Sequence, residues 1–266
     1  MSDRVTTQTV YPVGAEWLPS QIVEEGHYEL RFARDHEDLD RILKLRFEVF
    51  NLELGEGLDE SFESGRDVDE FDAVCHHLMV SDRESGELVG TYRLQTSEMA
   101  RQNRGFYSQQ EFQLDQLPSS VLSSALEVGR ACVAESHRNT QTLFQLWRGL
   151  AIYVAHNRKR YLFGCSSLTS QDPVEGRAVM ALLERKGHLH PELRIDPQPE
   201  CVCYDEGFEL DPDFPAKLPT LFRIYLRHGA KVCGPPAIDR LFKTIDYLVI
   251  FDVDAMDPRM FQTYFE

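Results

Sequence analysis

Strand-like and helix-like segments alternate along this 266-residue chain, and that alternation limits the possible folds more than any other feature. The strand-like segments are short apolar or alternating runs, whereas the helical segments carry apolar residues on one face. We expect strands at 28–33, 77–81, 88–94, 125–133, 161–167 and 247–253, and helices at 37–51, 142–157, 173–186 and 218–228. Strands interleaved with helices predict an α/β or α+β domain around one sheet.

The ends of the chain predict where this domain lies. Residues 1–27 contain two prolines and little periodicity, so we expect an N-terminal extension followed by one domain over residues 28–266. The first residues lack the basic start and apolar run of a signal peptide, and the most apolar window, residues 247–251, is too short to span a bilayer. The six cysteines are scattered. A cytoplasmic location is therefore expected, with peripheral contact at the inner membrane surface left open.

Charge is unevenly distributed along the chain. Its 28 Lys and Arg against 44 Asp and Glu give a net charge of −16, which excludes a general nucleic-acid binder. Residues 48–72 hold ten acidic residues, one basic residue and three glycines, a composition that predicts an acidic loop. Residues 136–171 hold no Asp or Glu, and they carry Arg138, Arg148, Arg158, Lys159 and Arg160. This acid-free segment predicts either an anion-binding region or a solvated basic face.

Two charged positions lie in apolar surroundings. Arg46 falls on the apolar stripe of the helix expected at 37–51, where a guanidinium needs an anionic partner or a ligand. Glu127 and Arg130 lie in the apolar strand at 125–133, and Gly129 between them would permit a bulge. A carboxylate in a cleft can act as a general base, and the alternative is an ion pair between Glu127 and Arg130 at a strand edge.

A helix start and several potential ligands complete the candidates. Residues 137–142 lead from a strand into a helix N-terminus, where free N–H groups and Arg138 favour a phosphate. No metal site is expected, since His188, His190, Cys201 and Cys203 fit no common zinc spacing. Cys75 and Cys165 are interpreted as packing residues rather than nucleophiles.

Several segments together resemble the bacterial GNAT-type N-acyltransferases of the ornithine lipid synthesis (hemolysin-like) family. The matching segments cover about residues 28–260 in order: LRFEVF at 45–50, DVDEFDAVCHHLMV at 67–80, ELVGTYRL at 87–94, EVGRACV at 127–133, LFQLWRGLAIY at 143–153, RYLFGCSSL at 160–168 and GAKVCGPPAIDRLFKTIDYLVIFDVDAM at 229–256. The resemblance implies a GNAT-like core, with a mixed V-split sheet flanked by helices and a family-specific C-terminal element at about 205–266.

A more distant likeness to acyl-homoserine lactone (AHL) synthases and N-acyl amino acid synthases implies roles for single residues. It implies catalytic roles for Glu127 and Arg130, and acceptor binding by Arg46, Phe50, Asp69, Asp72 and Arg93. Donor contacts are expected from Ala131, Cys132, Val133, Arg138, Asn139, Thr140, Gln141 and Thr142. The donor in such families is acyl carrier protein or acyl-CoA, with no bound cofactor, and the acceptor is an amino acid.

The sequence departs from ordinary GNAT enzymes at the donor loop. Residues 138–142 lack the small residues that bind the acetyl-CoA pyrophosphate, which favours a carrier protein as the donor. The basic residues 158–160 are the expected docking position for that carrier protein. The usual tyrosine acid is also missing, because no Tyr occurs between Leu162 and Glu200. We expect direct transfer of a fatty acyl group to an amino acid, with ornithine as the leading acceptor. The alternatives are a synthase of N-acyl amino acid or lactone signals and a non-catalytic acyl-thioester-binding module.

Overall fold

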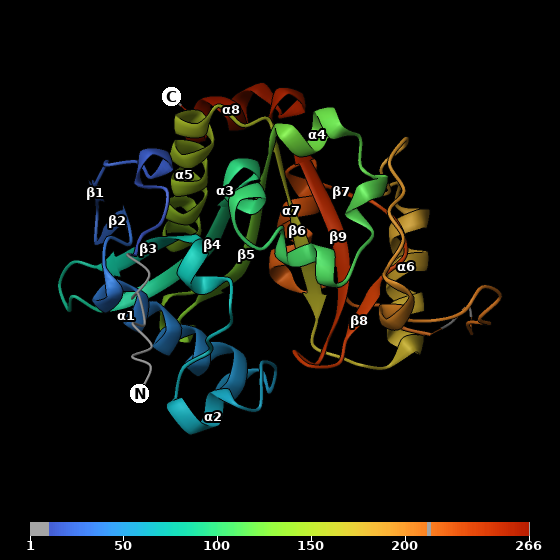
Figure 1. Ribbon diagram of the computed structural model, residues 1–266. Helices are drawn as coiled ribbons and strands as arrows, with labels where there is room; N and C mark the ends of the chain where they lie inside the picture. Colours follow the sequence, from blue (N-terminus) through green and yellow to red (C-terminus); the bar gives the residue numbers. More distant parts are fainter. Residues whose placement is uncertain (1–10, 212–213, 266) are drawn as a thin grey trace, which may run out of the picture.

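One mixed sheet organises the computed structural model, which describes residues 11–211 and 214–265 (Figure 1). In the described residues, the sheet has nine strands in the order β1-β2-β3-β4-β5-β6-β9-β7, and β8 also pairs with β9. The strands are β1 (Val23–Glu25), β2 (Tyr28–Phe32), β3 (His76–Asp82), β4 (Leu88–Thr96), β5 (Ala125–Val133), β6 (Tyr161–Leu168), β7 (Lys231–Val232), β8 (Ala237–Asp239) and β9 (Thr244–Asp252).

The sheet opens between β5 and β6, its one parallel pair of neighbours in the described residues. Their pairing covers three positions and ends at Glu127 opposite Phe163, although both strands continue further. Gly164, directly after the last paired position, allows a close approach to β5, because a Cβ there would lie 2.1 Å from the carbonyl oxygen of Val128. This separation is the V-shaped split that the family resemblance implies.

Two helices cover opposite faces of the first half of the sheet. Neighbouring residues of a strand point to opposite faces. On β3, Leu78 faces α5 (Thr140–Asn157), where it limits the space at Gly149, and Met79 packs in the cluster that contains Ile42 of α1 (His36–Arg46). Both helices start with a side-chain cap, from Asp35 and Asn139 respectively.

The second half of the sheet packs against the remaining large helices. These are α6 (Pro173–Arg185), α7 (Thr220–Arg227) and α8 (Pro258–Phe265), and Tyr264 of α8 packs against the first half of α5 (Figure 1). Residues 97–124 form an excursion between β4 and β5 with two short helices, α3 (Ser97–Gln102) and α4 (Ser119–Ser123). Phe106 and Phe112 of this excursion pack on β6 and β9 in a second apolar cluster. The excursion therefore covers the sheet beside the split.

The expected strands and large helices are confirmed, with two differences. The helix expected to run to residue 51 changes after Arg46 into a π-helical turn (Phe47–Glu53), and the acidic loop includes a short helix, α2 (Ser61–Ser64). Of the expected extension, residues 1–10 lie outside the described residues. The part from residue 11 packs on the domain, because β1 joins the sheet and the buried Tyr11 hydroxyl hydrogen-bonds His77 Nδ1 at 2.9 Å.

Candidate active site

A β-bulge shapes the strand that carries Glu127. On β4, Thr91 pairs with Cys132 and Arg93 pairs with Gly129, so Tyr92 faces two residues of β5 instead of one. The predicted bulge is confirmed, but the residue with left-handed backbone is Arg130, with φ +46°, rather than the glycine before it. A non-glycine residue in this region is strained, and such strain is common at functional sites. The bulge turns Arg130 toward the same cavity as Glu127.

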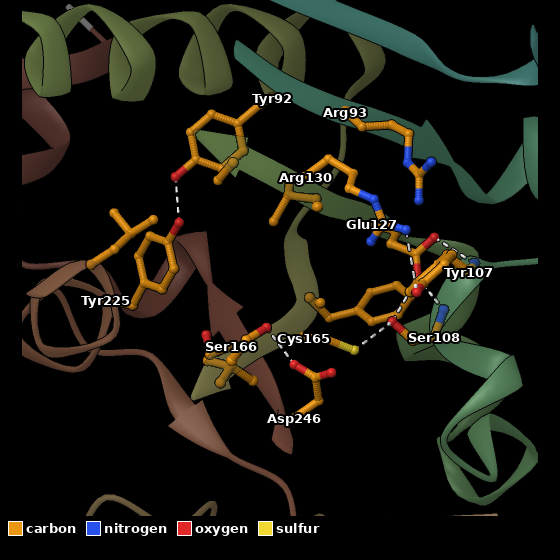
Figure 2. Close-up of a pocket in the computed structure, with 18 of the residues that line it drawn as sticks. Tyr92, Arg93, Tyr107, Ser108, Glu127, Arg130, Cys165, Ser166, Tyr225 and Asp246 are labelled. Atoms are coloured by element: carbon orange, nitrogen blue, oxygen red, sulfur yellow. Dashed lines mark hydrogen bonds between the residues drawn. The ribbon is translucent and has the colours of Figure 1, made fainter. Parts of the chain in front are cut away.

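The Glu127 carboxylate is held by the excursion between β4 and β5 (Figure 2). Its Oε2 accepts a hydrogen bond from the Tyr107 N–H at 2.8 Å, and its Oε1 accepts from the N–H and the hydroxyl of Ser108, both at 2.7 Å. Burial raises the pKa of Glu127 above the ordinary value, and the Ser108 and Tyr107 hydrogen bonds and Arg93 partly offset this shift. A buried, oriented carboxylate with a raised pKa suits a general base.

Arg130 binds groups other than Glu127. Its guanidinium lies 4.6 Å from the ring centre of Tyr107 and 4.1 Å from that of Phe242, and Nη2 donates to Asp69 Oδ2 at 3.0 Å. Its Nε is buried without a hydrogen-bond partner. No ion pair joins Glu127 and Arg130 in the part of the chain that the structure describes, so the alternative of a pair between them is not supported.

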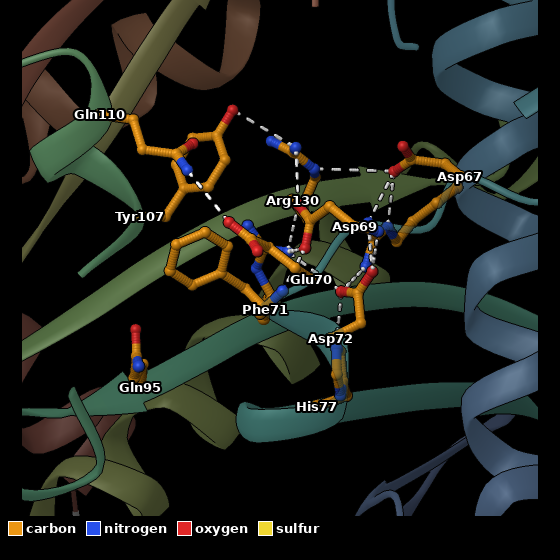
Figure 3. A network of polar contacts seen from close by, with 12 residues as sticks. Asp67, Asp69, Glu70, Phe71, Asp72, His77, Gln95, Tyr107, Gln110 and Arg130 are labelled. Atoms are coloured by element: carbon orange, nitrogen blue, oxygen red, sulfur yellow. Dashed lines mark hydrogen bonds and ion pairs between the residues drawn. The ribbon is translucent and has the colours of Figure 1, made fainter. Parts of the chain in front are cut away.

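Three arginines and three aspartates form a charge-balanced network behind the cavity (Figure 3). Arg46 is fully buried between Asp67 and Asp72, so the expected anionic partner of this helical arginine is confirmed. Burial alone raises the pKa of Asp72, but Arg46 and Arg93 outweigh it and hold the pKa well below its usual range. The ion pairs link Arg46, Arg93 and Arg130 with Asp67, Asp69 and Asp72.

This network already pairs some of the residues that were expected to bind the acceptor. Asp69 and Asp72 are already paired with arginines, whereas Arg93 and Arg130 also line the cavity. Phe50 lines the cavity as well, with its ring 5.4 Å from that of Phe242. The acceptor roles of these residues stay predictions, and the geometry favours the two cavity-lining arginines.

The cavity of about 320 Å³ lies between the separated strands and has two chemically different ends. One end is apolar and includes Trp147, Leu150, Phe222, Val249 and Phe251. Tyr92 and Tyr225 share a hydrogen bond on this side, and Figure 2 shows them well away from Glu127 and Ser108. The apolar end has the character of a site for a hydrocarbon chain.

The other end of the cavity is acidic. Glu56, Glu111, Asp239 and Asp246 line it, and one carboxylate oxygen from each of the last three lies within 4.8 Å of the others. Burial raises the pKa of Glu56 to about 7. Burial and the nearby charges of Asp246 and Asp239 raise the pKa of Glu111 well above its usual range. The three clustered carboxylates could surround one cation, either an ammonium group or a metal ion.

The expected donor residues follow β5 into α5. Ala131 lines the cavity, Cys132 is buried just beyond it, and Val133 accepts a hydrogen bond from Arg138. Arg138 also forms a two-bond ion pair with Glu53. The Asn139 side chain accepts the Thr142 N–H at 2.9 Å, which uses one of the free donors at the start of α5. Thr140 and Gln141 form the exposed first turn.

The prediction that residues 158–160 together form a basic docking patch for a carrier protein is wrong. The Lys159 ammonium is buried and bound to Glu98, and Arg160 pairs with Asp252 and Asp254. These residues also follow the far end of α5, whose 18 residues place them about 27 Å from the helix start. The acid-free stretch is therefore partly neutralised by acids from other segments.

Several cavity residues gave no signal in the sequence. Tyr107, Ser108 and Glu111 belong to the excursion at 97–124, which lacks clear periodicity, and Asp246 lies in a strand expected only from residue 247. Cys165 also lies in the cavity, with Sγ 3.6 Å from Ser108 Oγ. Burial, followed by the charge of Glu111, raises the pKa of this thiol well above its usual range, which disfavours a thiolate nucleophile.

Comparison with known proteins identifies the fold class. Residues 45–148 match the family model described as an acetyltransferase (GNAT) domain. The solved AHL synthase LasI aligns with TM-score 0.51 at 13% identity over 91% of this chain and 96% of its own. FeeM, an N-acyl amino acid synthase from uncultured soil microbes, aligns with TM-score 0.51 at 10% identity over 87% and 95%. These matches define the fold as that of the GNAT acetyltransferase class.

Sequence relatives narrow this class further. The L-ornithine N(alpha)-acyltransferase of Rhizobium meliloti (strain 1021) is 30% identical over 250 residues, covering 90% of this chain and 84% of the relative. That of Rhodobacter capsulatus is 32% identical over 251 residues, covering 89% and 94%. The chain belongs to this family of N-acyltransferases. Within the described residues, no helix is both long and apolar enough to cross a membrane.

Proposed function

We propose that this protein transfers a fatty acyl group from a thioester, carried by acyl carrier protein or CoA, to the α-amine of ornithine. The observation that carries the proposal is the cavity itself. It places an apolar arm and an acidic end on one continuous site, beside a buried glutamate at the point where the strands separate. The names of the relatives support ornithine as the acceptor.

The proposed reaction is a direct attack without an acyl-enzyme. Glu127, directly or through a water, takes a proton from the acceptor ammonium, and the neutral amine attacks the thioester carbonyl. A C–N bond forms and the C–S bond breaks. The attacking nitrogen then loses a second proton, which the leaving thiolate takes up, and the first proton, held by Glu127, is released to solvent. Backbone N–H groups of residues 129–131, beside the bulge, would stabilise the oxyanion intermediate.

Both substrates can be assigned places along the cavity. The acyl chain would occupy the arm near Trp147 and Phe251, with the donor's phosphate-bearing end toward the start of α5. Arg130 would hold the acceptor carboxylate, since its guanidinium lines the cavity and its contacts with two aromatic rings give it a fixed, charged position.

Mass spectrometry of the reaction products tests this proposal. Purified protein is incubated with palmitoyl-CoA or palmitoyl-acyl carrier protein and an equimolar mixture of amino acids. We expect N-palmitoyl-ornithine as the main product, and comparison of the two donors shows which one is used more efficiently. Acylation of another amino acid alone would replace the acceptor assignment, and binding of the donors without any acylated amine would support a non-catalytic module.

A further inference from the structure

The acidic end of the cavity has more negative charge than its neighbours neutralise. The two cavity-lining arginines, Arg93 and Arg130, are balanced together with Arg46 by three aspartates of the network behind the cavity. No arginine or lysine forms an ion pair with Glu111, Asp239 or Asp246 within the described residues. A buried group of carboxylates without cations binds either protons or a cationic ligand.

Glu111 gives the second, independent indication of a ligand. It is 3% exposed, it lines the cavity, and its Oε1 has no hydrogen-bond partner. Its Oε2 accepts only from the Cys165 thiol, at 3.7 Å, and the Glu111 carboxyl group also shares a hydrogen bond with Asp246. Asp246, by contrast, accepts hydrogen bonds from the hydroxyls of Ser167 and Thr244. Within the described residues, Glu111 is therefore the member of the cluster whose side chain lacks an N–H donor or an alcohol hydroxyl donor.

We propose that Glu111, Asp239 and Asp246 bind the side-chain ammonium of a dibasic amino acid acceptor. This inference rests on the acyl-transfer function proposed above and adds the residues that select the acceptor. An ammonium group has three N–H donors, which matches three carboxylate oxygens within 4.8 Å of one another. The raised pKa values of Glu111 and Asp246 agree with carboxyls that keep a shared proton until a cation replaces it.

The cluster lies within reach of the proposed reaction centre. Ser108 Oγ donates to Glu127 at 2.7 Å and lies 3.6 Å from Cys165 Sγ, which in turn lies 3.7 Å from Glu111 Oε2. Short side-chain contacts therefore connect the general base to the cluster. An acceptor with its α-amine at Glu127 would extend its side chain along this path toward Glu111.

The test compares ornithine with norvaline, which has the same carbon chain without the terminal amine. The ratio of their kcat/KM values is measured for the wild type and for Glu111→Gln and Asp239→Asn, with Asp115→Asn, an exposed residue outside the cavity, as the matched control. We expect the wild type to prefer ornithine. In each cluster variant the ornithine-to-norvaline ratio should fall about tenfold to a hundredfold. The fall should come from a lower kcat/KM for ornithine, because one bond to its charged ammonium is lost. In both variants the kcat/KM for norvaline should stay within about threefold of the wild-type value, because norvaline has no terminal ammonium for these carboxylates to bind.

The outcomes separate this inference from the function on which it rests. An unchanged ornithine-to-norvaline ratio in both variants, or equal losses with both acceptors, would overturn the ammonium site while acyl transfer still stood. Loss of both activities on EDTA treatment, restored by a divalent metal, would assign the cluster to a metal ion instead. If the wild type acylated neither amino acid nor any other amine, the proposed function itself would fail.

Discussion

Glu127 shows how a single side chain is prepared for its role. Burial favours its protonated form, whereas the three hydrogen bonds from Tyr107 and Ser108 and the charge of Arg93 favour the ionised form. The net result is a raised pKa, so the base is ionised only above a higher pH than for an exposed glutamate. Activity that requires the ionised form should therefore fall as the pH drops through this raised pKa.

Ser108→Ala tests this balance. The substitution removes the hydroxyl donor but keeps the backbone N–H, so the ionised form of Glu127 loses part of its stabilisation. We expect the acidic limb of the kcat/KM profile to move up by about one pH unit, with activity retained above the limb. Ser120→Ala, on the exposed α4, is the control. A limb that stays in place or moves to lower pH would remove Ser108 from the positioning of the base.

At the scale of elements, the arginine–aspartate network joins α1, the segment at 67–72, β4 and β5. Every charge in it is matched inside the protein, so the network supports the site mainly by fixing the positions of Arg93 and Arg130. Removing one partner from such a buried set leaves an uncompensated charge. The cost should exceed that of breaking an exposed pair.

Asp72→Asn measures this difference. It leaves Arg46 and Arg93 short of one negative charge, and we expect a loss of about 3 kcal/mol in the free energy of unfolding in urea. Asp40→Asn, which breaks exposed contacts with Lys44 and Arg66, is the matched control and should cost less than about 1 kcal/mol. Equal effects of the two substitutions would show that the network adds no particular stability.

The elements themselves were largely predictable, whereas the pairing of side chains was not. Periodicity located β5, α5 and β6, and the glycine before Arg130 indicated a bulge, because these features depend on neighbouring residues. The partners of Asp72 and Lys159 come from distant segments, so no local pattern indicated them. The excursion that carries Ser108 and Glu111 is irregular for the same reason, since tertiary packing determines its course.

At the scale of the whole molecule, the net charge of −16 averages over unlike regions. The acid-rich segment at 48–72 is partly neutralised by buried arginines, and the acid-free segment at 136–171 is partly neutralised by Glu53, Glu98 and Asp252. Within the cavity, a group of acids without an ion-pair partner in the described residues lies at one end. The charge pattern of the linear sequence therefore does not show where charge is unbalanced inside the site.

The two ends of α5 are expected to contribute differently to donor binding. If the phosphate-bearing part of the donor lies at the start of α5, Arg138→Glu should raise the apparent KM for the donor several-fold by repulsion. Arg158→Glu, at the far end of the same helix, should leave it unchanged. Steady-state kinetics at low salt checks both variants. An effect of Arg158 equal to that of Arg138 would contradict this placement of the donor.

The most direct test of the account is the rate of N-acyl-ornithine formation by Glu127→Gln. The variant keeps the size and the hydrogen-bonding ability of the side chain but cannot take the ammonium proton. We expect turnover to fall by about a hundredfold or more at saturating substrates, with the thermal unfolding temperature and donor binding unchanged. Turnover close to that of the wild type, measured by mass spectrometry of the same product, would contradict the role of Glu127 as the base.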